Sequence, residues 1–387
     1  MQYKKKQILI ACDSSRSLLG FRGKLMEALL VNNKVSVFTP KIHQDEVRDQ
    51  LYAMGVNIYE NNLDGSNVSI FSDLVYIIKL YKLIKQIKPD VFFPYTFKPV
   101  IYGSLIANYC NVNNISPMLT GLGFNFLDQN KGKSVLKKIT QTLLKYSLKA
   151  NHRTRLILQN KDDYHTLIQS GIISKKNKTF VVNGSGVDLT HYEYSKPKAN
   201  TLSFLMIARL INAKGIKEYY EAAKLIKQKY PDVKFKLIGP YDHNVDAIHP
   251  NLYQEIKSGL VIDYLGEVDD VRPHIKDSSA VVLPSYYGEG VPRSLLEAMA
   301  MGRAIITSDS VGCKETIDLT NGHQSGFLIP IKNIQALAEK MQHFILYPSD
   351  IISFGRNGRD YAFEKFDVQK VNRHMLYILE ANTVSIV

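Results

Sequence analysis

The sequence is poor in cysteine and has no long apolar run. Among its 387 residues, Cys12, Cys110 and Cys313 lie far apart, with neither zinc-ligand spacing nor an even count for a disulfide framework. No apolar stretch approaches the roughly 18–20 residues of a membrane-spanning helix, and the run from Ile8 to Ala11 is too short for a signal-peptide core. We therefore expect a cytoplasmic protein with three reduced thiols that does not cross a membrane.

Motifs for metals and dinucleotides are also incomplete. The acidic pairs Asp162-Asp163 and Asp269-Asp270 lack the D-x-D spacing of a metal-binding pair, and the ten histidines include no i, i+4 pair for zinc. Gly121-x-Gly123 lacks the third glycine of a dinucleotide fingerprint. We expect no metal and no cofactor.

Acidic residues are absent from one long segment of this basic chain. The formal net charge of +13 implies an anionic partner: nucleic acid, a membrane surface or a phosphorylated substrate. Residues 129–161 contain no acid, and apolar residues recur there at helical spacing. We expect a basic amphipathic helix over 133–149 that lies on anionic lipid, or that only packs its apolar face into the core; the two interpretations are compatible. No aromatic-interleaved basic platform is present, so nucleic acid is not an expected partner.

Short β-like runs alternate with helical segments along the chain, which predicts an α/β fold with parallel sheets covered on both faces. A glycine-rich stretch over 183–188 interrupts the alternation. We therefore expect two Rossmann-like domains facing each other across a cleft, 1–183 and 184–367, with a terminal helix within 368–387 packing back on the first. Strands are expected at 7–11, 34–39, 56–59, 90–94, 156–159, 179–182, 201–207, 234–238, 261–265, 280–283, 304–307 and 326–329, and helices at 22–32, 45–54 and 71–87.

The most specific motif follows the expected strand 280–283. A glycine-flanked acid, Glu289, precedes Gly290, Val291 and Pro292, and Pro292 is favourable as a first helical residue. The backbone N–H groups of Gly290 and Val291 would then lie at a helix N-terminus, which favours an anion. Glu297 lies about one and a half turns inside the helix, so the two carboxylates would reach opposite ends of an elongated ligand. A nucleotide-sugar has that shape.

A second motif follows the strand 201–207. The strand delivers Arg209 to its carboxyl end, and Lys214 is expected to open the next helix. A guanidinium and an ammonium at a strand edge suit a diphosphate, which the Arg can bind bidentately and the Lys as a point charge. These cations would neutralise a leaving diphosphate without a metal.

Together these motifs resemble glycosyltransferase family 4, the retaining enzymes of the two-Rossmann-domain (GT-B) type. The resemblance implies that Glu289 contacts the transferred sugar, that Glu297 binds the ribose and that Arg209 and Lys214 bind the donor diphosphate. It also implies that Gly239 belongs to the nucleotide site and that the backbone near Val268 holds the base.

The first domain is similar to a subgroup of this family, bacterial transferases that extend undecaprenyl-diphosphate-linked sugars, for instance with N-acetylgalactosamine. The similarity is carried by Ser17 to Arg22 and by Thr120 to Phe124, which places Arg22, Thr120, Gly121 and Gly123 on the acceptor side. It implies transfer of a hexose or N-acetylhexosamine from UDP-GalNAc or a related UDP-sugar to a lipid-diphosphate-linked saccharide at the inner face of the membrane. A soluble acceptor and a UDP-sugar epimerase of the same architecture remain alternatives.

Overall fold

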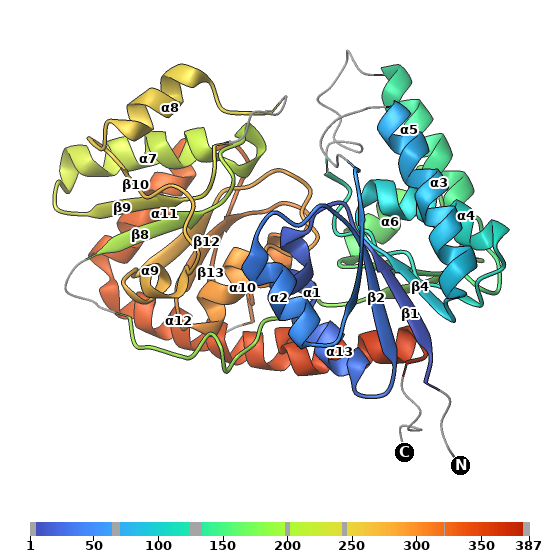
Figure 1. The fold of residues 1–387 in the computed structure, drawn as a ribbon. Helices are drawn as coiled ribbons and strands as arrows, with labels where there is room; N and C mark the ends of the chain where they lie inside the picture. The colour runs from blue at the N-terminus through green and yellow to red at the C-terminus, as the bar shows by residue number, and fades with distance from the viewer. Residues whose placement is uncertain are drawn as a thin grey trace. The chain divides into compact units, whose positions relative to one another are not determined.

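The computed structural model describes residues 5–63, 70–123, 134–197, 202–241, 246–320 and 322–381. The chain forms two compact units, one of Met1–Ser185 with Lys370–Val387 and the other of Gly186–Gln369. In each unit a parallel sheet carries helices on both faces (Figure 1). Of the helices within the described ranges, none is sufficiently long and apolar to span a bilayer.

The first unit is built on a five-stranded sheet of order β3-β2-β1-β4-β5. Its central strand β1 is flanked by β2 and β4, and residues Ile8 to Ala11 are fully buried, as expected for a parallel strand covered on both faces. Strands β6 and β7 pair with each other, and a bridge between Met118 and Ile157 joins them to the segment that follows β5. The strands are β1 Gln7–Ala11, β2 Lys34–Pro40, β3 Asn57–Asn61, β4 Val91–Pro94, β5 Asn114–Ile115, β6 Arg155–Leu158 and β7 Lys178–Val181.

Helices cover both faces of this sheet. Apolar residues of the terminal helix α13, among them Val371 and Met375, are buried with strand residues such as Ile8 and Ile10. The helix that returns the chain from the second unit is therefore part of the first unit's core. The helices of this unit are α1 Arg16–Leu30, α2 Asp45–Ala53, α3 Ile70–Ile87, α4 Ser104–Tyr109, α5 Ser134–Ser147, α6 Lys161–Gln169 and α13 Val368–Ile378.

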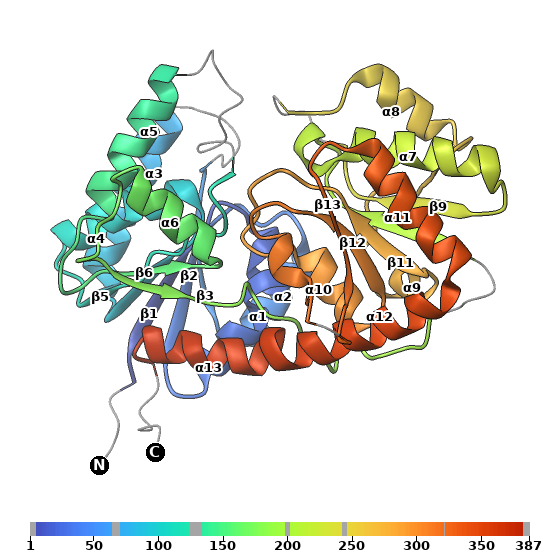
Figure 2. The same cartoon turned by 180° about the vertical axis from the view of Figure 1, so that it is seen from behind.

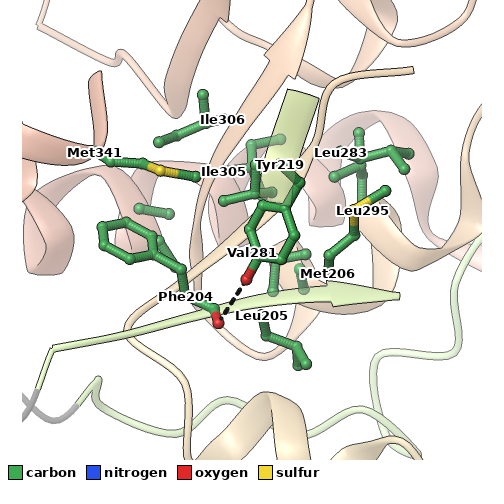
Figure 3. Packing of buried hydrophobic residues seen from close by; sticks show 14 of the residues in the cluster. Phe204, Leu205, Met206, Tyr219, Val281, Leu283, Leu295, Ile305, Ile306 and Met341 are labelled. Carbon is green, nitrogen blue, oxygen red and sulfur yellow. Dashed lines mark hydrogen bonds between the residues drawn. The ribbon is translucent and has the colours of Figure 1, made fainter. Parts of the chain in front are cut away.

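The second unit has a six-stranded parallel sheet of order β10-β9-β8-β11-β12-β13. Phe204, Val281 and Ile305 come from three adjacent strands and pack in one core, where the Tyr219 hydroxyl donates to the Phe204 carbonyl at 2.9 Å (Figure 3). Its strands are β8 Ser203–Ile207, β9 Lys234–Ile238, β10 Asp263–Tyr264, β11 Ala280–Leu283, β12 Ala304–Ser308 and β13 Gly326–Ile329. Its helices, seen from behind in Figure 2, are α7 Ile216–Lys229, α8 Pro250–Lys257, α9 Arg272–Lys276, α10 Arg293–Ala300, α11 Ile334–Leu346 and α12 Pro348–Tyr361.

The chain enters and leaves the second unit through two paired segments. The Val187 N–H donates to the Phe366 carbonyl at 2.8 Å, and the Val368 N–H donates to the Val187 carbonyl at 3.1 Å. Gly186 has a φ of +69°, and a Cβ there would lie 2.7 Å from the Val368 Cα. The expected glycine-rich connection therefore needs a glycine at this position for its conformation and for the close approach of the returning chain.

Candidate active site

The sheet of the second unit reverses its strand order between β8 and β11. From these neighbours the chain order runs outward in both directions, to β9 and β10 on one side and to β12 and β13 on the other. The crevice beyond the carboxyl ends of two such strands is where open α/β sheets bind ligands. Arg209 and Lys214 follow β8 and Glu289 follows β11, so the residues predicted from the sequence lie at this switch point.

Lys214 and Glu289 form an ion pair there. The Lys214 ammonium contacts Glu289 Oε1, which also accepts a 2.9 Å hydrogen bond from the Ser285 hydroxyl. The ammonium lies 5.2 Å from the centre of the Tyr287 ring, close enough for a cation–π contact. Both charged side chains are largely buried. The site therefore holds a cation and a carboxylate in direct contact, each oriented by a further neighbour.

The expectation that Lys214 opens a helix was wrong. Asn212–Lys214 is a single 3₁₀ turn, and α7 begins two residues later at Ile216. Gly215 between them has a φ of +79°, and a Cβ there would overlap the Pro284 carbonyl oxygen. The left-handed residue ends the turn, so the Lys214 side chain is held by a tight loop against the end of β11.

The three loops that follow β8, β11 and β12 are tied together. The Tyr286 N–H donates to the Ala213 carbonyl at 2.8 Å, and the Ser310 hydroxyl donates to the Ser285 carbonyl at 2.7 Å. Gly312, which sequence analysis did not single out, has a φ of +79°, and a Cβ there would overlap the Glu289 and Gly290 carbonyl oxygens. The loop carrying Glu289 is thereby fixed from both sides.

The helix behind Glu289 begins one residue later than expected. Pro292 has a ψ of 119° and caps the helix rather than forming its first turn, and α10 starts at Arg293. Gly290, Val291 and Pro292 are buried in the segment that enters the helix. Their backbone still leads into the N-terminus of α10, but Gly290 and Val291 are not its first N–H donors.

Glu297 lies in a separate polar cluster. Its Oε1 accepts hydrogen bonds from the Tyr192 hydroxyl at 2.8 Å and from Arg293 Nε at 2.7 Å, and the residue is only 7% exposed. Burial, and then the negative charge of Glu297, raise the pKa of Tyr192 well above its usual value, so this hydroxyl stays protonated as a donor. The two carboxylates thus have different partners, as the sequence predicted for groups that do not form a dyad.

Gly239 and Val268 lie at the adjacent strand ends of the same sheet. The Gly239 N–H donates to the Gly266 carbonyl at 2.8 Å, and the Tyr264 hydroxyl donates to the Gly239 carbonyl at 2.9 Å. Val268 is half-buried against the core. Gly239 has a φ of +144°, and a Cβ there would overlap the Ala208 carbonyl oxygen. The bare backbone of Gly239 therefore lets the ends of β8 and β9 approach closely next to Arg209, which is exposed.

In the first unit, the structure brings Arg22 to the segment that leads to Thr120. Arg22 of α1 is 4% exposed, its guanidinium lies 5.1 Å from the Tyr95 ring centre, and it donates to Met118 Sδ at 3.1 Å. Thr120 is half-buried, and Gly121 and Gly123 have positive φ values of 120° and 51°. Arg22 therefore contacts the segment that leads into this loop, through Met118. Phe124 lies outside the described residues.

In the parts of the chain that the structure describes, we find no cluster of metal-ligating side chains and no reactive thiol. No group of three or more His, Cys, Asp or Glu residues there is arranged to hold a metal ion. All three cysteines are free thiols. Cys313 lies near the switch point, where burial raises its pKa to about 12, so it stays protonated and is not a nucleophile.

Comparison with known proteins assigns both halves of the chain to one class of enzyme. Residues 21–161 match a family described as glycosyl transferase 4-like, and residues 201–346 match glycosyl transferases group 1. An N,N'-diacetylbacillosaminyl-diphospho-undecaprenol alpha-1,3-N-acetylgalactosaminyltransferase of Campylobacter jejuni is 29% identical over 338 residues, 84% of this chain and 85% of the relative. A UDP-Gal:alpha-D-GlcNAc-diphosphoundecaprenol alpha-1,3-galactosyltransferase of Escherichia coli is 28% identical over 70% of each chain.

Solved structures agree on the fold over nearly the whole length. A sucrose-phosphate synthase from Thermosynechococcus elongatus superposes with a TM-score of 0.78 at 18% identity, over 97% of this chain and 98% of that one. Anabaena HepE in complex with UDP-glucose gives a TM-score of 0.76 at 18% identity, over 97% and 100%. The chain therefore has the two-domain GT-B fold. Because the two matched families together cover most of the chain and describe the same chemistry, we conclude that the protein is a glycosyltransferase whose residues 201–346 form a group 1 glycosyl transferase domain.

Proposed function

We propose that the protein transfers a hexose or N-acetylhexosamine from a UDP-sugar, UDP-GalNAc or a close analogue, to a saccharide carried on a lipid diphosphate. The observation that carries the proposal is the Lys214–Glu289 pair at the switch point of the second sheet. The relatives from Campylobacter jejuni and Escherichia coli, whose names describe transfer to diphospho-undecaprenol-linked sugars, support the lipid-linked acceptor. The HepE complex with UDP-glucose supports a UDP-sugar donor.

The second unit offers separate groups for each part of the donor. Lys214 and Arg209 supply positive charge for the diphosphate beyond the end of β8. The hydrogen bonds from Tyr192 and Arg293 both fall on Glu297 Oε1, and in this proposal Oε2 accepts from a ribose hydroxyl. The strand ends at Gly239 and Val268 present backbone to the base.

Transfer moves negative charge onto the leaving diphosphate and positive charge onto the sugar ring. Lys214 and Arg209 stabilise the first, because both follow β8 at the strand end and Lys214 is held there by Glu289 before the reaction begins. Glu289 orients the sugar, and its contact with Lys214 places the carboxylate next to the phosphate that departs. We infer that transfer retains the anomeric configuration, with a donor phosphate oxygen taking the acceptor's proton, and that no metal is required.

The acceptor belongs, in this proposal, to the first unit. Arg22 and the loop of Thr120, Gly121 and Gly123 are the residues that we assign to the acceptor side. A lipid-linked acceptor places the enzyme on the cytoplasmic face of the cell membrane as a peripheral protein. The exposed lysines of α5 would then face anionic headgroups.

A donor screen tests the proposal directly. Thermal shift and slow donor hydrolysis are measured across UDP- and GDP-sugars, and the best donor is then offered with undecaprenyl-diphosphate saccharides and with water-soluble saccharides. We expect a UDP-N-acetylhexosamine or UDP-hexose to give the largest shift and transfer to the lipid-linked acceptor alone. Transfer only to the soluble saccharide would favour that alternative, and isomerisation of the free UDP-sugar without acceptor would identify an epimerase.

A further inference from the structure

Helix α3 of the first unit exposes an apolar stripe that the core does not use. Its inner face is fully engaged, since Tyr76, Leu80 and Ile84 are buried in a cluster with strand residues. On the outer face Phe71, Leu74 and Ile78 are 79%, 52% and 54% exposed. With Tyr81, which is 38% exposed, they recur at i, i+3, i+7 and i+10 and so form one continuous face of the helix. We call these four residues the α3 stripe.

The stripe continues onto the neighbouring helix. The ring of Tyr81 lies 6.1 Å from the ring of Tyr109 on α4, and Tyr109 is 76% exposed. In both views α3, α4 and α5 lie side by side within the first unit (Figures 1 and 2). Isolated exposed apolar side chains are common on soluble proteins, but a row of four with an adjoining tyrosine is a contiguous patch of the kind that marks an interaction site.

The exposed charges on the described residues of α3, α4 and α5 are of one sign. Lys82 and Lys85 are exposed and continue the same helical face, at i+11 and i+14 from Phe71, and the Lys85 ammonium lies 5.8 Å from the Tyr81 ring centre. Among α3, α4 and α5 the sequence has a single acid, Asp73. Asp73 is buried and accepts from Lys98 Nζ at 2.9 Å and from the Tyr102 hydroxyl at 2.8 Å, so its charge is compensated inside the unit.

Helix α5 adds to this basic surface in a way that the sequence did not predict. Leu144 and Leu148 are buried, as expected for its apolar face, but Ile139 is 50% exposed although its spacing placed it on that face. Ile139 and Tyr146 instead lie on the outer side of α5, together with the exposed Lys138 and Lys145. Apolar and basic side chains are thus interleaved on two neighbouring helices.

We propose that the α3 stripe is a membrane-docking surface whose apolar side chains insert between the headgroups of an anionic bilayer while the flanking lysines bind lipid phosphates. This pattern of aromatic and aliphatic side chains beside lysines is that of helices lying in a membrane interface. A second copy of the chain is the poorer occupant, because a symmetric contact would bring two basic surfaces together. The inference rests on the proposed lipid-linked acceptor and deepens it. It adds insertion of the apolar side chains to the electrostatic attraction between the lysines and the bilayer.

The absence of tryptophan gives a sharp test, because a single introduced tryptophan is then the only indole in the full-length chain. Phe71→Trp is mixed with vesicles of 70% phosphatidylcholine and 30% phosphatidylglycerol, some prepared with brominated acyl chains. We expect a blue-shifted emission and quenching by the brominated lipid. Leu260→Trp, at an exposed apolar position of the second unit, is the matched control and should show neither.

Flotation with the same vesicles tests the energetics. The triple variant Phe71→Ser, Leu74→Ser, Ile78→Ser should bind at least tenfold more weakly than wild type, including at 0.5 M salt, where lysine contacts are screened. The control triple Leu260→Ser, Leu319→Ser, Leu346→Ser removes three exposed apolar side chains elsewhere and should bind like wild type. Unchanged UDP-sugar thermal shift in the first triple would show that it is folded.

Three outcomes would decide against the surface: no quenching of Phe71→Trp, equal flotation of the two triples, or a wild-type dimer that the first triple converts to monomer. The last would identify a self-association face. Failure of the proposed function gives a different result. In that case quenching and the loss of flotation persist while no lipid-linked saccharide is extended.

Discussion

At the scale of single residues, Lys214 is the group on which the proposed chemistry depends most. Lys214→Ala should raise the barrier of transfer by roughly 2–4 kcal/mol, because the departing diphosphate loses a fixed cation. Arg209→Ala should act in the same direction. Initial rates with the best donor measure both effects, and Lys217→Ala, an exposed lysine three residues further along, is the matched control. Activity of Lys214→Ala within threefold of wild type would remove Lys214 from the mechanism.

The two glutamates should separate kinetically. Glu289→Gln keeps the size of the side chain that contacts Lys214 but removes its charge, and it should lower kcat with little change in the donor KM. Glu297→Gln should mainly raise the donor KM, because it alters the group assigned to the ribose. Glutamine is preferred to alanine at 297, since its amide oxygen can still accept from Arg293 Nε, whereas alanine would leave the mostly buried Arg293 without that hydrogen-bond acceptor. Equal effects of both variants on KM alone would contradict this division of roles.

The neighbours of these residues show where sequence reasoning ends. Lys214 and Glu289 could be predicted because each follows a strand within a short motif. Tyr192, which donates to Glu297 from 105 positions earlier, could not, since no local pattern relates the two. Gly312 was missed for the same reason: its need for glycine comes from the Glu289 and Gly290 carbonyls packed against it. Arg293 was within reach, because it precedes Glu297 by four residues on one helix.

At the scale of elements, strands could be placed from the sequence more securely than helix starts. Strands β1, β9, β11 and β13 have the expected bounds. In β1 and β11 this follows because strands buried on both faces form distinct apolar runs. Strand β5 has only two residues and was not predicted.

The expected basic helix over 133–149 is α5, described from Ser134 to Ser147, and Lys133 lies outside the described residues. The predicted starts of α7 and α10 were wrong. Gly215 with its left-handed φ precedes α7, and Pro292 with its extended ψ precedes α10, and neither conformation could be predicted from the residue type alone.

Gly239 lies at the strand ends that the proposed function assigns to donor binding. Gly239→Ala should lower the apparent Tm of the second unit by about 5 °C or more, because a left-handed φ costs roughly 1–3 kcal/mol for a residue with a side chain and the new Cβ would also overlap Ala208. The stabilisation of the protein by UDP should fall as well. Differential scanning calorimetry with and without UDP measures both.

Gly20→Ala is the matched control, since it is helical and a Cβ there would have no atom within 4 Å. It should leave the apparent Tm of the second unit unchanged. If Gly239→Ala retained full stability and UDP response, the close approach of β8 and β9 would not be what the site requires.

At the scale of the whole molecule, the net positive charge indicates how the proposed anionic substrates would be neutralised. With a formal net charge of +13, cations are available both at the strand ends and on the first unit's helices. We therefore expect transferase activity to persist in EDTA, because Lys214 and Arg209 neutralise the diphosphate. Rates measured with and without excess EDTA should agree within twofold. Loss of activity in EDTA with rescue by Mn²⁺ would show that a metal does this instead.

The same charge should make membrane binding depend on salt through α5. The triple variant Lys137→Gln, Lys138→Gln, Lys145→Gln removes three positive charges near the proposed bilayer contact, each worth about 1 kcal/mol beside anionic lipid at low ionic strength. Vesicle binding of this variant should fall by roughly tenfold or more in 50 mM salt and differ little from wild type in 0.5 M salt, where charges are screened within a few ångströms.

The control triple Lys217→Gln, Lys229→Gln, Lys257→Gln lowers the net charge equally but from exposed positions of the second unit. If a general attraction of the basic protein for lipid were responsible, both triples would lose the same affinity. We expect only the α5 triple to do so, with UDP binding intact in both. Wild type that sediments equally with neutral and anionic vesicles at low salt would rule out the electrostatic contribution, and a soluble acceptor would then account better for the site.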